Sequence, residues 1–364
     1  MKKTSATWSL LLLATLVQVA PAQWISNGPL PRKAHSAVFD PSTRQMIIFA
    51  GTSSFSYSQR FANDDVWRLL PSASLVGVQS WVASNPTGSP PAARWGHLAG
   101  YDPGSNRMIV FGGETVSLGN YIYLNDVWIL TNANGNGEPS AWVGGGSGGP
   151  TGRLYTAGAY DPISNTLMIY GGQTSGGKLA DYWVLSHANG LGGTATWTYF
   201  SPLGGGPGPR DGQTAVYDAA SNELILFGGS NNQSVYFNDT WVLKNANGMA
   251  GTPVWQELFP TGGPPPDRAY SSAIYDPVSN AMTIFGGAYG LNDTWFLAHA
   301  NGTGGTPAWS TFSHSLSDDP HVRDSHTAVY DPSSNVMIIY GGEPLNDYSV
   351  ELGDVFFLSH ANGQ

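Results

Sequence analysis

The sequence predicts an all-β protein made of six copies of one four-stranded unit, and three observations lead to this prediction. An Arg followed by an alternating segment that ends in Asp recurs six times, at intervals of 55 to 62 residues. Short β-branched and aromatic runs bounded by Gly, Pro, Asn and Asp fill each interval. Charged residues are only 11% of the chain, whereas Gly (47) and Trp (13) are abundant, a composition that favours strands and turns over amphipathic helices.

Each unit contains four short segments that we call strands a to d. Strand a follows the Arg and alternates in character, as in HTAVYD at 326–331. A DPxSN turn leads to strand b, for example MIVFGG at 108–113; Pro suits the first position of such a turn and Asn its left-handed position. Strand c is of the NDVWIL type, and strand d is a short Trp segment after an ANGxGG turn. The units begin at Arg32, Arg94, Arg153, Arg210, Arg268 and Arg323.

Eleven of the 13 Trp fall on two positions of the repeat, counting Trp24. A bulky ring at a fixed repeat position is typical of core packing between units rather than of a ligand site. Strand c carries Trp67, Trp128, Trp183, Trp241 and Trp295, with Phe356 in the sixth copy, and strand d carries Trp81, Trp142, Trp197, Trp255 and Trp309.

The sixth copy ends at LSHANGQ, without a strand d. The segment QWISNGPLPR at 23–32 has the order Trp, Pro, Arg that follows strand d in the other copies. We therefore predict that Trp24 supplies the missing strand and closes a ring of six units. Deletion of residues 23–28 is expected to lower stability much more than the loss of an ordinary tail.

Residues 1–22 have the order of a secretory signal peptide: Lys2 and Lys3, an apolar run, and the small-residue ending Ala20-Pro21-Ala22. We expect cleavage before Gln23 and a secreted or periplasmic destination. Residues 23–364 would then form a single soluble domain, because no later segment has about 18 uninterrupted apolar residues. We expect a monomer.

The composition excludes several classes of protein. The chain has no Cys, so thiolate metal sites and thiol nucleophiles are excluded. A net charge of −10 with only 15 Lys and Arg argues against nucleic-acid binding, which depends on basic residues that neutralise phosphates. We expect no cofactor.

The repeated unit, with Gly-Gly at the end of strand b, Asn-Asp-x-Trp on strand c and a later Trp, resembles the kelch repeat over residues 23–364. The resemblance implies a six-bladed β-propeller, with strand a lining the channel and the N-terminal strand joining the last blade. Two departures are Ala50-Gly51 in the first copy and Gly353-Asp354-Val355-Phe356 in the last. The galactose oxidase that shares this fold needs copper and a Cys–Tyr crosslink, so the lack of Cys excludes that chemistry.

The loops predict which face carries function. The a–b and c–d connections share one face and hardly vary, whereas the b–c and d–a connections share the other face and differ in length and chemistry. We call the second the variable face and place the binding site there, because function usually lies in variable loops on a rigid scaffold. The predicted ligand-binding residues are Trp95, Glu114, Gln173, Ser230, Tyr289, Glu343, Tyr57, Tyr121 and Arg94.

The six Arg are matched by one strand-c Asp per copy: Asp65, Asp126, Asp181, Asp239, Asp293 and Asp354. A charge removed from water needs a partner, so we expect structural pairs that fix blade to blade, with use of an Arg in the pocket as the alternative. Three His at the third position after the Arg, His35, His97 and His326, are candidate metal ligands, but a hydrogen-bonded structural role is the favoured interpretation.

The sequence favours a non-catalytic binding module that recognises a glycan or an extracellular protein segment. One alternative is an enzyme acting on a sugar, of isomerase or lyase type, with Glu114 and Glu343 as the acid–base candidates. The other is a surface or envelope scaffold.

Overall fold

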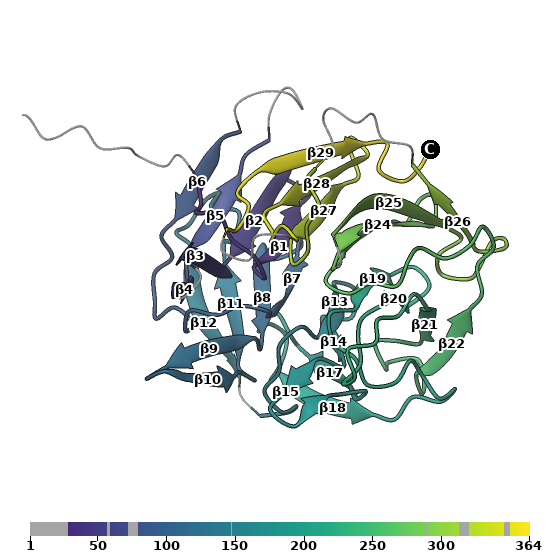
Figure 1. Ribbon diagram of the computed structural model, residues 1–364. Coiled ribbons are helices and arrows are strands. Elements are labelled where there is room, and N and C mark those ends of the chain that lie inside the picture. The colour runs from purple at the N-terminus through teal and green to yellow at the C-terminus, as the bar shows by residue number, and fades with distance from the viewer. Residues whose placement is uncertain are drawn as a thin grey trace, which may run out of the picture.

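The computed structural model describes residues 28–56, 59–71, 79–146, 148–288, 290–312, 320–345 and 350–364. Six antiparallel sheets surround a central channel, with strand a innermost, so the chain is a six-bladed β-propeller (Figure 1). The kelch-type fold predicted from the sequence is confirmed. No helix of the described residues has the length and apolar character needed to cross a membrane.

Five blades have the strand order a–b–c–d, and the described part of the sixth has a–b–c. Blades one to three are β1 (Ser36–Asp40), β2 (Gln45–Phe49), β5 (Val66–Leu69), β6 (Trp81–Ser84); β7 (Leu98–Asp102), β8 (Arg107–Phe111), β11 (Val127–Thr131), β12 (Ala141–Gly146); and β13 (Ala157–Asp161), β14 (Thr166–Tyr170), β17 (Tyr182–Ser186), β18 (Thr196–Phe200). Blades four to six are β19 (Thr214–Asp218), β20 (Glu223–Phe227), β21 (Thr240–Lys244), β22 (Val254–Leu258); β23 (Ser272–Asp276), β24 (Ala281–Gly287), β25 (Leu291–Ala298), β26 (Ala308–Thr311); and β27 (Thr327–Asp331), β28 (Val336–Tyr340), β29 (Val355–Ser359).

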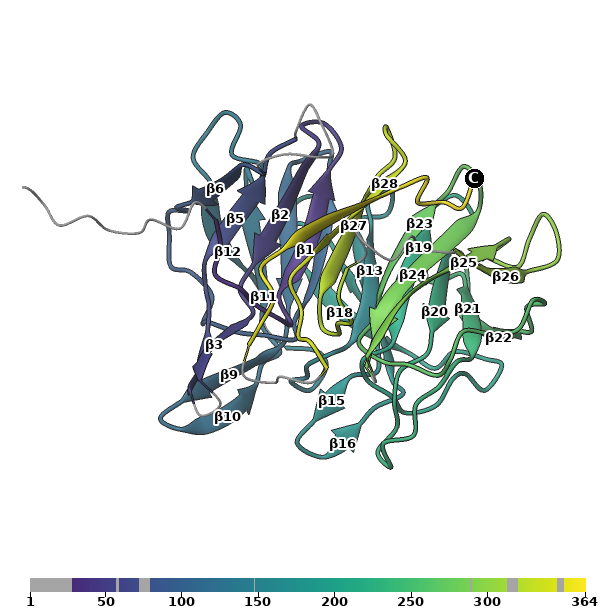
Figure 2. The same cartoon turned by 45° about the horizontal axis from the view of Figure 1, so that its top comes forward.

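Three further hairpins belong to the b–c connections of blades one to three: β3 (Thr52–Ser56) with β4 (Gln59–Ala62), β9 (Glu114–Ser117) with β10 (Asn120–Tyr123), and β15 (Gln173–Thr174) with β16 (Gly177–Lys178). They extend from one end of the propeller, which is the variable face (Figure 2).

The core lies between blades. Strand b is buried along almost its whole length because both of its faces pack on neighbouring sheets. The aromatic residue near the end of strand b packs on the strand-d Trp of the next blade. The pairs are Phe49–Trp142, Phe111–Trp197, Tyr170–Trp255, Phe227–Trp309 and Tyr340–Trp81, with ring centroids 4.8 to 5.2 Å apart. Packing between units, the predicted role of the strand-d Trp, is confirmed for these five.

A ring of six backbone hydrogen bonds closes the propeller around its channel. The residue two positions after each unit Arg donates its N–H to the carbonyl of its counterpart in the preceding blade, and all six have positive φ. These residues are Ala34, Gly96, Tyr155, Gly212, Tyr270 and Ser325, and we call them the neck. Blades six and one are therefore joined within the described residues. The predicted strand at Trp24 lies outside them and stays a prediction.

Side chains also link the blades at the face opposite the variable face, where the a–b and c–d turns lie. The Asp that ends strand a accepts a hydrogen bond from an Asn in the c–d turn of the next blade, as in Asp40–Asn134 and Asp218–Asn301 (2.7 and 2.8 Å). Blade one differs because Arg44, in its a–b turn, donates to Asp331 of blade six at 2.6 Å. Every junction around the ring thus has a donor to a strand-a carboxylate.

Candidate functional site

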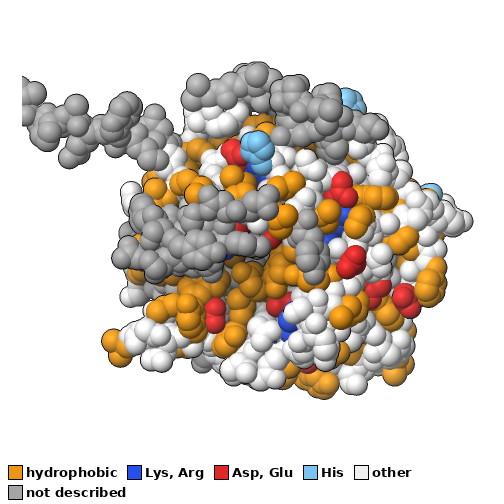
Figure 3. All heavy atoms as spheres, in the orientation of Figure 1, with side chains coloured by type: hydrophobic (Ala, Val, Ile, Leu, Met, Phe, Trp, Pro, Cys, Tyr) orange, Lys and Arg blue, Asp and Glu red, His pale blue; other side chains and the backbone are white. Residues whose placement is uncertain are grey.

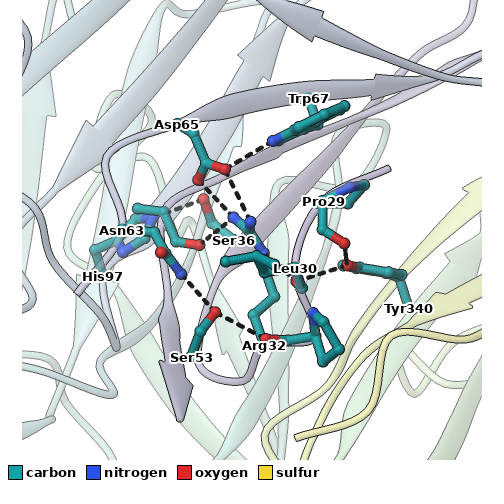
Figure 4. A network of polar contacts seen from close by, with 12 residues as sticks. Pro29, Leu30, Arg32, Ser36, Ser53, Asn63, Asp65, Trp67, His97 and Tyr340 are labelled. Carbon is teal, nitrogen blue, oxygen red and sulfur yellow. Dashed lines mark hydrogen bonds and ion pairs between the residues drawn. The ribbon is translucent and has the colours of Figure 1, made fainter. Parts of the chain in front are cut away.

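Each unit Arg forms a buried structural bracket. Arg94, whose exposed fraction is 0%, donates to both oxygens of Asp126 (2.8 and 2.9 Å), to the Gly112 carbonyl (2.9 Å) and to the Ala92 carbonyl (3.0 Å). Figure 4 shows the same arrangement around Arg32, where Asp65 also accepts from the Trp67 indole (2.7 Å). The structural pairing is confirmed, and it occupies the Arg94 guanidinium that was also a predicted ligand contact.

The Arg–Asp pair itself lies within one blade, so the prediction that this pair fixes blade to blade is corrected. The link between blades comes from the Arg backbone: Arg94 N–H donates to the Asn63 carbonyl of blade one, and Gly51 N–H donates to the Arg94 carbonyl. Arg32 makes the equivalent bonds with Leu352 and Gly342 of blade six.

The three candidate metal-binding His point sideways to neighbouring blades. The Nε2 atoms of His35, His97 and His326 lie 2.7 to 2.8 Å from hydroxyls of Thr327, Ser36 and Ser272. Burial lowers the pKa of all three imidazoles, to about 3 for His97 and His326, so they are neutral at pH 7. No group of three His, Asp or Glu in the described residues is arranged to hold a metal ion.

The mouth of the channel on the variable face is lined by pairs of residues. In five blades the residue after the unit Arg forms a two-way backbone bridge with the residue after Gly-Gly (Ala-Gly in blade one), and Trp95 pairs with Glu114 in this way at 2.9 and 3.0 Å. Gln173, Ser230 and Glu343 occupy the equivalent position opposite Leu154, Asp211 and Asp324. Four of the predicted residues therefore lie together around the axis, on blades two, three, four and six.

Four carboxyl groups and two Lys set the charge of the mouth. Lys33 forms an ion pair with Glu343, and Lys178 Nζ lies 2.7 Å from Asp211 and 2.6 Å from Ser230 Oγ. Burial raises the pKa of Asp324 to about 6, and the nearby Glu343 carboxylate adds to the rise. Burial also raises the pKa of Glu114, against a hydrogen bond from Trp95. The sequence pointed to the two Glu, but Asp211 and Lys178 were missed because the residue types at these positions differ from blade to blade.

Two Tyr rings form the floor of the mouth. Tyr155 and Tyr270 belong to the neck, and their rings pack edge to face with centroids 4.9 Å apart. The Tyr270 ring lies over Gly212: a Cβ added there would be 2.6 Å from Tyr270 Cε1. The Tyr270 hydroxyl also approaches Asp211, at 3.3 Å. Small residues fill the other four neck positions, leaving a small cavity of about 140 Å³ beside the rings.

The β9–β10 hairpin presents large apolar side chains to solvent. Their exposed fractions are 48% for Val116, 99% for Leu118, 68% for Tyr121 and 42% for Ile122. The Tyr121 ring packs on Trp95 with a centroid distance of 6.2 Å, so the hairpin adjoins the mouth. Figure 3 shows hydrophobic side chains gathered over this region. Trp95 and Tyr121, two of the predicted ligand-binding residues, are thus in contact. Two others, Tyr57 and Tyr289, lie outside the described residues.

The geometry defines a class of protein: a closed six-bladed propeller whose one face carries a charged mouth and projecting hairpins. The KLHDC2/KLHL20/DRC7 Kelch-repeats domain family matches residues 163–364, more than half of the chain. The chain belongs to the kelch-repeat family.

Several relatives share this repeat. Kelch repeat-containing protein 2 of Saccharomyces cerevisiae is 27% identical over 222 residues, which are 60% of this chain and 24% of that protein. Acyl-CoA-binding domain-containing protein 5 of Arabidopsis thaliana is 25% identical over 339 residues, 87% of this chain and 48% of that protein. This chain thus spans about half or less of either relative. The solved structure of YjhT has a TM-score of 0.63 at 16% identity, covering 92% of this chain and 96% of that one, which supports the fold.

Proposed function

We propose that this protein is a non-catalytic binding module whose variable face engages a protein segment through the β9–β10 hairpin and the adjoining mouth. The observation that carries the proposal is the apolar surface of the hairpin. Val116 and Tyr121 are cross-strand partners on one face of the hairpin, Leu118 lies in its turn and Ile122 lies on the other face, and exposed apolar surface of this kind marks protein interaction sites. Membership of the kelch family is consistent with a protein-binding role.

The charge of the mouth adds a second element of recognition. Glu114 lies beneath Trp95, and Asp211 and Glu343 each pair with one Lys. A partner segment on the hairpin would therefore meet an apolar patch and, next to it, a polar rim, the composition usual for protein interfaces. Glu114 and Glu343 contribute to this rim, and we assign neither a catalytic role.

A glycan is the second candidate ligand, and the Trp95–Tyr121 pair is the observation that favours it. Aromatic rings beside hydrogen-bonding groups such as Glu114 and Gln173 suit the apolar faces and hydroxyls of a sugar. We also propose export, on the basis of the leader at 1–22. Sequencing of the N-terminus of protein collected outside the cytoplasm would test this: Gln23 as the first residue is expected, and retention of residues 1–22 would contradict it.

The test of the proposed function uses a photo-crosslinking residue placed at position 118 in the full chain. Crosslinked proteins are identified from the source cells, and the binding of each purified partner is then measured with and without substitutions. Leu118→Ser with Tyr121→Ser is expected to weaken binding at least about tenfold, which corresponds to about 1.4 kcal/mol.

The matched control is Val278→Ser, an equally exposed apolar residue (93%) in an a–b turn of the opposite face, which should leave affinity unchanged. Unchanged affinity in the double variant would reject the hairpin as the interface. Binding on a glycan array that depends on Trp95 and Tyr121, with no crosslinked protein, would favour the glycan instead.

A further inference from the structure

The channel contains a second cavity on the side of the neck that faces away from the variable face. Its volume is about 380 Å³, and it extends along the strands a to the a–b turns at Pro162 and Ala219. Two layers of side chains line it. One is small, with Ala37, Ala99, Gly158, Ala273 and Ala328, and the other is aromatic, with Phe39, Tyr101, Tyr160, Tyr217, Tyr275 and Tyr330. We call this cavity the lower channel.

The side chains that line the lower channel are apolar on the channel side, because their only polar atoms, the Tyr hydroxyls, are hydrogen-bonded in the a–b turns. Each Tyr hydroxyl donates to the Asn of its own a–b turn, at 3.0 to 3.2 Å, as in Tyr101–Asn106 and Tyr330–Asn335. In blade one the aromatic residue is Phe39, which has no hydroxyl, and Arg44 stands where the other turns have Asn. No charged side chain lines the cavity.

Six buried Asp side chains surround these apolar side chains. The residue after each aromatic ring is a buried Asp: Asp40, Asp102, Asp161, Asp218, Asp276 and Asp331. Burial would raise the pKa of Asp40, Asp218, Asp276 and Asp331, but hydrogen bonds from Ser, Thr, Asn and backbone N–H groups, with Arg44 at Asp331, outweigh it and hold each pKa below the usual value.

Most of this negative charge is balanced by dipoles rather than by cations. The donors to Asp40 and Asp218 are Ser, Thr and Asn side chains and backbone N–H groups, all neutral. Among the described residues, Arg44 is the one cation that forms a salt bridge with this set of Asp. These carboxylates therefore favour a positive charge in the lower channel.

We propose that the lower channel binds a small organic cation with an apolar body, of the size of a trimethylammonium group. The small and aromatic side chains of the lining favour a ligand with an apolar body, whose surface they remove from water. The surrounding carboxylates favour a positive charge, and aromatic rings are common in sites for quaternary ammonium groups.

Three probes of nearly the same shape and different charge test the proposal by calorimetry at pH 7: choline, 3,3-dimethyl-1-butanol and 3,3-dimethylbutanoate. Choline is expected to bind about tenfold more tightly than the neutral alcohol, or about 1.4 kcal/mol, and the carboxylate more weakly than both. Raised salt should reduce the affinity difference between choline and the neutral alcohol and should leave the affinity of the alcohol unchanged. Equal affinity for choline and the alcohol, or no binding of choline, would overturn the proposal.

Substitutions then locate the site. Ala273→Leu and Ala328→Leu fill the lower channel from two blades and should each reduce choline affinity at least about tenfold. Ala83→Leu makes the same change at an exposed position of the outer strand β6 and should have no effect. Thermal unfolding identifies any variant that does not fold. Choline binding that persists in folded Ala273→Leu and Ala328→Leu would place it elsewhere and reject this site.

Discussion

At the scale of single residues, the repeat assigns one structural role to each position and lets a few positions vary. The third residue after the unit Arg is His in blades one, two and six, and Gln213 in blade four. Gln213 donates to the Tyr170 carbonyl of the preceding blade at 2.9 Å, and His326 Nε2 lies 2.8 Å from the Ser272 hydroxyl of the preceding blade. Both residue types therefore bond to the preceding blade, but only His can take up a proton.

This difference predicts a pH dependence of stability. Because burial lowers the pKa of His326 to about 3, the unfolded chain takes up a proton below pH 6.5 that the native chain does not. Stability from this residue is therefore present above pH 6.5 and is lost as the pH falls toward 3, by about 2 kcal/mol between pH 7 and 5. His326→Gln should reduce the loss by that amount in urea unfolding at the two pH values. His321→Gln, at an exposed position, should not; an unaltered pH dependence in His326→Gln would contradict the assignment.

At the scale of strands and loops, the sequence predicts the elements that recur in every copy of the repeat and few others. Strands a to d follow from alternation and turn residues, because six copies show the same pattern. The neck was not predicted: left-handed backbone at Ala34, Tyr155 and Tyr270 arises from bonds around the ring, and those residue types do not signal it. The segment that forms the β9–β10 hairpin was predicted only as a variable loop. Its sequence occurs in one copy of the repeat, so no repeated pattern indicates which residues pair.

The hairpin offers a test at this scale, since blade five has a short b–c connection. Replacing ETVSLGNYIYLND (114–126) by AYGLND (288–293) removes apolar side chains that are largely exposed. We expect the unfolding temperature to change by no more than a few degrees, because little buried surface is lost. Binding of a partner that crosslinks at position 118 should be abolished.

The comparison for this graft is the same replacement of the blade-three loop QTSGGKLAD (173–181). There Lys178 forms an ion pair with buried Asp211, so its loss leaves a carboxylate without its cation and should clearly lower stability. If the blade-two graft destabilised the protein as much as the blade-three graft, the hairpin would be a packing element rather than a binding element.

At the scale of the whole molecule, the junction between blades six and one differs in chemistry from the other five. Those five use an Asn in the c–d turn to bond the preceding strand-a Asp, whereas this junction uses Arg44. The Lys33–Glu343 ion pair and the neck bond from Ala34 to Ser325 also cross it. The ring is thus closed with charged pairs as well as backbone bonds, where the first blade meets the sixth.

Arg44→Asn tests this closure. Asn is the residue of every other a–b turn and tolerates the positive φ of 55° found at position 44, so the turn itself should improve. The variant nevertheless loses two hydrogen bonds to the buried Asp331 carboxylate, of 2.6 and 2.9 Å. Because the Arg44 side chain is 47% exposed, we expect a net loss of only about 1 kcal/mol in urea unfolding. Arg107→Asn provides the control, since the Arg107 guanidinium donates to the Asn189 carbonyl of the next c–d turn rather than to a carboxylate. Equal stability of Arg44→Asn and the wild type would show that the Arg44–Asp331 pair does not help to hold blades six and one together.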